Sequence, residues 1–256
     1  MQARALIFDV DGTLADTEDL HRRAFNEAFA RHGLGWTWNR PQYAELLRIT
    51  GGKERIAAHL AILGLSGEDR RAIERRIGEI HRTKTQVYAR MMTEAELPLR
   101  EGVERICEEA MTAGVPLAIA STTTLDNVRA LLERHWGAGA LGRFVAVAAG
   151  DDVERKKPWP DAYLLALSRL GAPATACVAF EDSANGLAAA KGAGLCAVVT
   201  PSRWTMDEDF SAADLVLPSL GSPGRPLTGR AAERVGAPML GLEQIEELLA
   251  TTRRCA

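Results

Sequence analysis

From residue 99 onward, short apolar runs alternate with segments of helical periodicity. Runs of three to six apolar residues are too short for helices and suit buried strands. With one further run near the start of the chain, the expected strands are 6–8, 115–120, 144–148, 177–180, 196–199 and 215–217. The helices expected among them are 102–113, 125–135, 158–170, 184–193 and 242–249. Strands that alternate with helices form a parallel sheet covered on both faces, so the sequence predicts an α/β fold.

Residues 17–97 interrupt this alternation, because every periodic segment in them is helical and none has the pattern of a strand. The expected helices are one from Glu18 to about residue 32, then 43–47, 53–63 and 68–92. A stretch of this length suffices for a small subdomain. The predicted domains are therefore a core of residues 1–16 and 98–256 and an inserted helical domain of residues 17–97. The stretch 218–238, rich in Gly, Pro and Arg, is expected to be a surface loop.

The charge balance, 31 basic against 34 acidic residues, gives no general attraction to nucleic acid or to a membrane surface. No apolar stretch reaches the roughly 18 residues that a membrane span needs, and the first residues do not form a secretory signal. The four cysteines, at 107, 177, 196 and 255, form no C-x-x-C pair, which argues against zinc and for a reducing compartment. We therefore expect a cytoplasmic protein without nucleic-acid or membrane partners. Nothing in the sequence requires more than a monomer.

The first expected strand ends in Asp9-Val10-Asp11-Gly12. Burying a carboxylate without a charge partner is expensive, and α/β sheets bind ligands at the carboxyl ends of their strands. Strand alternation would send Asp9 and Asp11 the same way, and Gly12 lets the backbone approach a ligand closely. Paired carboxylates there suit a hard cation, or a nucleophile beside an acid–base group. A strand followed by an ordinary Asp-Gly turn is the alternative that this motif leaves open.

Three later positions also carry polar residues near expected strand or helix ends. The run Ser121-Thr122-Thr123 offers hydroxyl and backbone donors to phosphate oxygens, although such a run is more often a helix cap. Lys157 precedes Pro158, which suits the first position of a helix, and most lysines are simply exposed. The run Glu181-Asp182-Ser183 crowds carboxylates at another strand end, where a helix cap is again the alternative.

Together, in this order and over nearly the whole chain, these motifs resemble the haloacid dehalogenase-like phosphatase superfamily. The resemblance rests on Asp9-Val10-Asp11-Gly12-Thr13, Ser121, Lys157-Pro158 and Glu181-Asp182-Ser183-x-Asn185-Gly186. It implies a Rossmann-like core with an inserted, all-helical C1 cap. Three further stretches are similar to the CbbY type within the β-phosphoglucomutase-like branch, namely residues 16–26, 50–56 and 156–161.

The resemblance implies hydrolysis through a covalent intermediate. Asp9 would attack phosphorus as the nucleophile, and Asp11 would act as general acid and then as general base. Mg²⁺ would be held by Asp9, the backbone carbonyl of Asp11 and Asp182, with Glu181 nearby. The phosphoryl oxygens would be neutralised or held by Ser121, Thr122, Thr123 and Lys157.

The same resemblance assigns the choice of substrate to the cap. The turn Thr50-Gly51-Gly52-Lys53 leads into a helix, so its backbone N–H groups and the Lys53 ammonium would hold a second phosphate. By itself, Gly-Gly-Lys favours an ordinary helix start with a solvated lysine. The other cap positions that resemble substrate contacts are Glu18, His21, Arg55 and Lys84.

A small sugar bisphosphate is the implied substrate class. The CbbY type implies hydrolysis of xylulose 1,5-bisphosphate, an inhibitor of Rubisco, to xylulose 5-phosphate and phosphate. A phosphomutase of the β-phosphoglucomutase kind would share Asp9, Asp11, His21 and Lys84, and stays open together with a phosphatase of another small sugar phosphate. A non-catalytic sugar-phosphate binder is a different class, and the motifs disfavour it because a binder needs no nucleophile.

Overall fold

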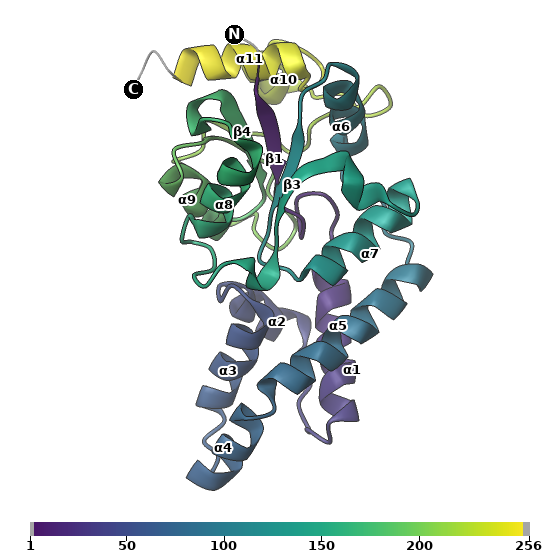
Figure 1. Cartoon of the computed structure of the whole chain (residues 1–256), viewed down its shortest axis with the longest axis vertical. Coiled ribbons are helices and arrows are strands. Elements are labelled where there is room, and N and C mark those ends of the chain that lie inside the picture. Colours follow the sequence, from purple (N-terminus) through teal and green to yellow (C-terminus); the bar gives the residue numbers. More distant parts are fainter. Residues whose placement is uncertain (1–2, 253–256) are drawn as a thin grey trace.

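The computed structural model of the chain describes residues 3–252, so Cys255 lies outside the described residues. The core is a six-stranded parallel sheet in the order β3-β2-β1-β4-β5-β6 (Figure 1). The strands are β1 Ala5–Phe8, β2 Leu117–Ala120, β3 Phe144–Ala148, β4 Cys177–Glu181, β5 Cys196–Val199 and β6 Leu215–Val216. The direction of the crossovers reverses between β1 and β4, which is where α/β sheets bind their ligands.

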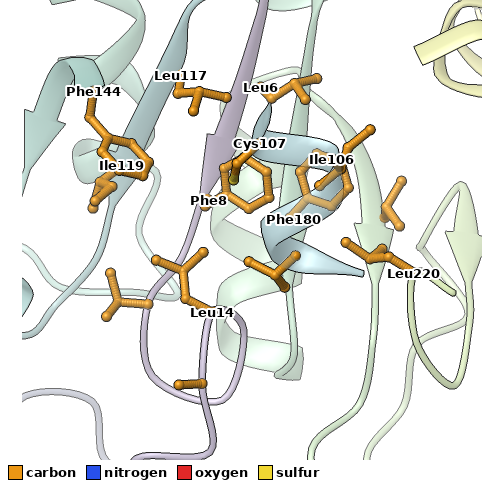
Figure 2. Close-up of a cluster of buried hydrophobic side chains, with 14 of the residues drawn as sticks. Leu6, Phe8, Leu14, Ile106, Cys107, Leu117, Ile119, Phe144, Phe180 and Leu220 are labelled. Atoms are coloured by element: carbon orange, nitrogen blue, oxygen red, sulfur yellow. The ribbon is translucent and has the colours of Figure 1, made fainter. Parts of the chain in front are cut away.

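The strands divide their side chains between two apolar layers, as the twofold period of a strand requires. Leu6 and Phe8 of β1 face one layer, where the Phe8 ring stacks on Phe180 of β4 with centroids 4.5 Å apart (Figure 2). Ala5 and Ile7 face the other layer. All four side chains of β1 are fully buried, so both faces of the sheet are covered at its centre.

Helices cover both faces of the sheet, as the sequence predicts, and the α/β class is confirmed. Those in the layer of Phe8 are α6 Val103–Thr112, α7 Leu125–Trp136, α10 Gly229–Val235 and α11 Leu242–Thr252. Those in the layer of Ile7 are α8 Asp161–Leu170 and α9 Ala184–Gly192. The short 3₁₀ turns are η1 Ala140–Arg143, η2 Gly150–Asp152 and η3 Ala174–Ala176.

A group of helices between β1 and α6 extends beyond the carboxyl edge of the sheet (Figure 1), and we call it the cap. Its members are α1 Glu18–Arg31, α2 Arg40–Leu47, α3 Gly52–Ile62, α4 Gly67–Glu74 and α5 Ile77–Glu94. The cap has its own apolar cluster, in which Phe25, Phe29, Trp38 and Tyr43 are buried. Across the described residues, no helix combines the length and the apolar character needed to cross a membrane.

The prediction of a single helix over residues 68–92 is wrong. The structure has two helices there, α4 and α5, with a break at Arg75-Arg76. Helix α4 buries no residue, whereas α5 buries Ile80 and Val87 along the face that packs on α1. Arg76 donates to the backbone carbonyl of His32 at 3.2 Å and so holds the break beside the end of α1. The change of direction lets α5 follow α1 while α4 stays at the surface.

Two predictions about the core are also wrong. Pro158 does not begin a helix, since α8 starts at Asp161. A proline disfavours helical geometry at the residue before it, so Pro160 delays the start of the helix. The stretch 218–238 is more than a surface loop, because it contains α10 and buries Leu220 in an apolar layer. Its Gly and Pro content conceals this helix from a prediction based on composition.

Candidate active site

Carboxylates from two neighbouring strands meet at the carboxyl edge of the sheet. Asp9 follows β1, and β4 ends in Glu181 with Asp182 next. The parallel register pairs Phe8 with Phe180, which brings Asp9 level with Glu181. One oxygen of each carboxylate lies within 4.8 Å of the others, and all three residues are buried. The sheet therefore gathers three of the predicted site residues at one point.

Lys157, in the loop before α8, is the cation of this cluster. Its Nζ donates to Asp9 Oδ1 at 2.6 Å and to Glu181 Oε1 at 2.5 Å. Tyr163 of α8 also donates to Glu181 Oε1, at 2.6 Å. Burial acts to lower the pKa of Lys157, but the two carboxylates outweigh it and hold the pKa above its ordinary value. Lys157 is therefore charged and fixes both carboxylates in place.

Three buried carboxylates lie close together here and only one lysine accompanies them, so the cluster has more acidic than basic groups and suits a cation. Burial raises the pKa of Asp9 to about 7, against the opposing effect of Lys157. Among the described residues, Asp182 has no ion pair within 4.0 Å. A Cβ on Gly12 would overlap the Asp182 carboxylate, so glycine is required there. Carboxylate oxygens are ligands that Mg²⁺ prefers, and the residues fit such an ion, with Asp9 and Asp182 as the ligands and Glu181 nearby.

Asp11 contacts the first helix of the cap through a single oxygen. Its Oδ1 accepts from Thr17 Oγ1 at 2.6 Å and from His21 Nε2 at 2.8 Å. Because a carboxylate only accepts, the neutral His21 ring carries its proton on Nε2, and Nδ1 accepts from Lys84 Nζ at 2.6 Å. Burial acts to raise the pKa of Asp11, but His21 and Thr17 outweigh it and hold the pKa well below its usual value. Thr17 is the residue before α1, but its hydroxyl binds Asp11 and makes no capping hydrogen bond to the helix.

The run Ser121-Thr122-Thr123 after β2 forms part of the wall of the same pocket. Ser121 is buried, and its Oγ accepts from the backbone N–H of Thr123 at 3.4 Å. Asn127 of α7 donates to the Thr123 hydroxyl at 2.9 Å. The alternative role for this run was to cap the N-terminus of helix α7. Thr124 takes that role instead. The three residues are therefore free of a capping role and border the space beside Asp9.

Helices of the cap complete the pocket wall. The predicted residues that they contribute to it are Glu18, His21, Thr50, Gly51, Gly52, Arg55 and Lys84. Asn185, in the first turn of α9, donates to Thr50 Oγ1 and to the Arg48 carbonyl, both at 3.1 Å. This pair of hydrogen bonds holds the turn before α3 against the end of β4, so the cap and the core enclose one space.

In the part of the chain that the structure describes, two predicted site residues do not line the pocket. Glu181 lies behind it, in contact with Lys157 and Tyr163. Lys53 Nζ forms an ion pair with Asp151 Oδ2 at 2.7 Å, and these two side chains are 41% and 68% exposed. Asp151 belongs to η2 of the core, so this ion pair joins the cap to the core.

Part of the pocket wall is formed by residues that belong to no sequence motif, so the sequence does not predict their role. Its residues come from α5, α7 and the loop after β5, and include His81, Asn127, Ser202, Trp204, Thr205 and Glu208. Thr205 Oγ1 donates to the backbone carbonyl of Asp182 at 2.6 Å, which fixes the loop beside the carboxylates. One feature of the sequence could have indicated the residues of this loop: they directly follow a strand, and the residues after strands at this edge of the sheet form the site.

This arrangement of sheet, carboxylates and helical cap belongs to one class of hydrolase. Residues 3–194 match the haloacid dehalogenase-like hydrolase family, and the chain belongs to that family. The match runs from β1 through α9 and so includes Asp9, Lys157 and Asp182. The chain is an enzyme, and its family and its relatives identify it as a phosphatase.

Similar proteins indicate which branch of this hydrolase family the chain resembles. Protein CbbY of Rhodobacter capsulatus is 49% identical over 222 residues, which cover 87% of this chain and 96% of that protein. A crystal structure of a CbbY mutant from Rhodobacter sphaeroides, in complex with xylulose-(1,5)bisphosphate, is similar with a TM-score of 0.79 and 47% identity, over 87% of this chain and 98% of that one. Fructose-1-phosphate phosphatase of Escherichia coli (strain K12) is 33% identical over 75% of this chain and 94% of that protein. The resemblance to the CbbY type is thus confirmed.

Proposed function

We propose that this protein is a Mg²⁺-dependent phosphatase that hydrolyses xylulose 1,5-bisphosphate to xylulose 5-phosphate and phosphate, and so removes an inhibitor of Rubisco. The observation that carries the proposal is a single pocket lined both by Asp9 and Asp11 of the core and by two basic residues of the cap, Lys84 and Arg55. A short sugar with an anionic group at each end suits a pocket with positive charge at more than one place. The CbbY complex with xylulose-(1,5)bisphosphate supports this substrate.

The proposed reaction has two steps, each a displacement at phosphorus. The negative charge of a bound phosphate would raise the pKa of Asp11, so that Asp11 takes up a proton before the reaction. In the first step, an Asp9 oxygen bonds to phosphorus, the bond to the sugar oxygen breaks, and Asp11 gives this proton to that oxygen. In the second step, a water oxygen bonds to phosphorus, Asp9 leaves, and Asp11 takes the proton of the water. Both contacts of Asp11, from Thr17 and His21, are to Oδ1, so Oδ2 is the oxygen that carries the proton. Mg²⁺ held by Asp9, Asp182 and the Asp11 carbonyl would supply positive charge to the phosphoryl oxygens.

We assign the binding of the transferring phosphoryl group to the wall beside Asp9. Ser121, Thr122 and Thr123 would donate hydrogen bonds to its oxygens, and Lys157 would neutralise their charge. Lys157 already contacts the nucleophile at 2.6 Å, so it would also keep Asp9 oriented for attack. This arrangement would stabilise the charge that accumulates on the phosphoryl oxygens as the bond to the sugar breaks.

Removal of divalent metal is expected to stop phosphate release. Without a bound cation, the phosphoryl oxygens beside Asp9 and Asp182 would lack the positive charge that Mg²⁺ supplies. Enzyme treated with EDTA should lose at least about 99% of its activity, and added Mg²⁺ should restore it. In Asp182→Asn, half-maximal activity should require about tenfold more Mg²⁺ or higher. Full activity in EDTA would contradict the metal site.

We also propose that Lys53 exchanges its partner when substrate binds, leaving Asp151 for the second phosphate. Lys53→Ala should then lower kcat/KM for xylulose 1,5-bisphosphate about tenfold or more while p-nitrophenyl phosphate changes less than about twofold. Asp151→Asn is the matched control, because it breaks the same ion pair and keeps the lysine. This control should retain the bisphosphate activity. Equal losses on both substrates in Lys53→Ala would exclude a contact with the second phosphate.

A phosphomutase of the β-phosphoglucomutase kind is the second candidate, and the contacts of His21 with Asp11 and Lys84 agree with it equally well. A panel of sugar phosphates separates the candidates: xylulose and ribulose 1,5-bisphosphate, fructose 1,6-bisphosphate, fructose 1-phosphate, phosphoglycolate and β-glucose 1-phosphate. The phosphatase should release phosphate from xylulose 1,5-bisphosphate above all others. Formation of glucose 6-phosphate without net phosphate release would identify a mutase instead, and preference for another member of the panel would identify a different phosphatase.

The proposal also covers the motion of the cap, the cellular compartment and the oligomeric state. We propose that residues 17–97 act as a mobile cap whose two connections to the core serve as hinges, near Asp16 and Pro98. Ala15 pairs with Leu99, so the two connections run side by side and would bend together. We also propose that the protein is a cytoplasmic monomer. The buried free thiols of Cys107, Cys177 and Cys196 agree with a reducing compartment.

A further inference from the structure

Tyr43 of α2 is fully buried and joins two charged residues of the pocket wall. Its hydroxyl donates to Glu18 Oε2 at 3.0 Å and accepts from Arg55 Nη1 at 3.0 Å. The Arg55 guanidinium also lies over the Tyr43 ring, 5.2 Å from the centroid. A tyrosine hydroxyl has one proton, so it can bridge a carboxylate and a guanidinium in this direction only. Tyr43 therefore sets the spacing of a negative and a positive group that both line the pocket.

Arg55 is a buried cation that lacks an anionic partner. Its Nε donates to the Leu46 carbonyl at 3.0 Å, and within the described residues it forms no ion pair inside 4.0 Å. Glu18 likewise has no ion pair there, and it accepts from Tyr43 through Oε2. A buried charge is stabilised by a charged partner, so Arg55 is suited to bind an anionic group of a ligand. The other oxygen of Glu18 can accept a hydrogen bond from a hydroxyl of the same ligand.

The ring of Tyr43 also touches the core. Trp204, in the loop after β5, packs edge-on against it, with centroids 5.8 Å apart and an interplanar angle of 83°. The same loop is tied to β4, because Thr205 Oγ1 donates to the Asp182 carbonyl at 2.6 Å. Tyr43 thus lies where the cap meets the loop beside the carboxylates, and this contact holds its hydroxyl between Glu18 and Arg55.

We propose that Tyr43 is a positioning residue that makes the pocket selective for ligands with a hydroxyl group next to an anionic group. It holds Arg55 for the anionic group and Glu18 for the hydroxyl. A polyol phosphate with a second charge offers both groups, whereas p-nitrophenyl phosphate offers only the phosphoryl group that reacts at Asp9. The inference rests on the proposed function for the class of substrate.

The test is Tyr43→Phe, which removes the hydroxyl and keeps the ring against Trp204. We expect kcat/KM for the sugar phosphate that the wild type hydrolyses best to fall about tenfold or more, through KM, because two charged groups lose a hydrogen bond. The value for p-nitrophenyl phosphate should change less than about twofold. This comparison uses whichever sugar phosphate the wild type hydrolyses best. If xylulose 1,5-bisphosphate is not hydrolysed in the panel, the proposed substrate is refuted, but the test of Tyr43→Phe can still be made.

Tyr88→Phe is the matched control. Tyr88 is also fully buried in the cap, but its hydroxyl has no hydrogen-bond partner among the described residues. This variant should keep the wild-type ratio of the two kcat/KM values. Arg55→Lys, a second variant that keeps the charge but loses the planar fork, should shift the ratio in the same direction as Tyr43→Phe. An unchanged ratio in Tyr43→Phe, or equal losses on both substrates, would overturn the proposal.

Discussion

Replacement of Asp9 by asparagine is expected to lower kcat for phosphate release at least about 10³-fold on every substrate. An amide is too weak a nucleophile to form the aspartyl-phosphate, and the change also removes one of the three carboxylates of the cation site. The side chain keeps its size, so the fold and the cap residues that contact the sugar should be unaffected. Substrate binding, measured by calorimetry, should therefore persist while turnover is lost.

A matched control for the loss of one carboxylate is Asp126→Asn. The Asp126 side chain is 71% exposed on α7 and does not line the pocket. This variant should turn over all substrates at the wild-type rate. If Asp9→Asn also retained full turnover, the covalent mechanism would be wrong, and water would have to attack the substrate phosphorus directly.

Replacement of Lys157 by methionine is expected to remove turnover and also to destabilise the fold by about 3–5 kcal/mol. The lysine is buried between Asp9 and Glu181, with 4% of its side chain exposed. Methionine fills a similar volume but leaves the two carboxylates without their cation in a site from which water is largely excluded. The free energy of unfolding in urea, measured in EDTA so that no metal replaces the lysine, tests the second effect.

Lys191→Met is the control for this prediction. Lys191 Nζ pairs with Asp214 at 2.8 Å, but its side chain is 33% exposed. Ion pairs in contact with water contribute about 0–1 kcal/mol, so this variant should lose little stability. Equal destabilisation in the two variants would contradict the claim that Lys157 compensates buried negative charge.

The sheet and the carboxylate cluster could be predicted from the sequence because both depend on local patterns. Asp9 and Asp182 each follow a short apolar run, and parallel strands bring their carboxyl ends to one edge. A correct assignment of strands is therefore enough to place these residues together. The same holds for Ser121, which follows β2 and lines the pocket with Asp9.

The wall formed by the cap could not be predicted in this way. Lys53 and Arg55 are two residues apart on α3, and residues at that spacing point in different directions. Which of them enters the pocket depends on how α3 packs against α2 and α5, and Arg55 is the one that does. Tyr43 carries no local motif either, because its position depends on contacts with Glu18 and Trp204, which lie far from it in the sequence.

The decisive measurement is phosphate release from xylulose 1,5-bisphosphate and from ribulose 1,5-bisphosphate by the same enzyme in the presence of Mg²⁺. The two substrates differ only in the configuration of one hydroxyl-bearing carbon. A pocket that binds a hydroxyl through Glu18 and an anionic group through Arg55 should favour xylulose 1,5-bisphosphate by at least about tenfold in kcat/KM. Equal turnover of the two bisphosphates, or release from neither while another sugar phosphate is hydrolysed, would contradict the proposed function.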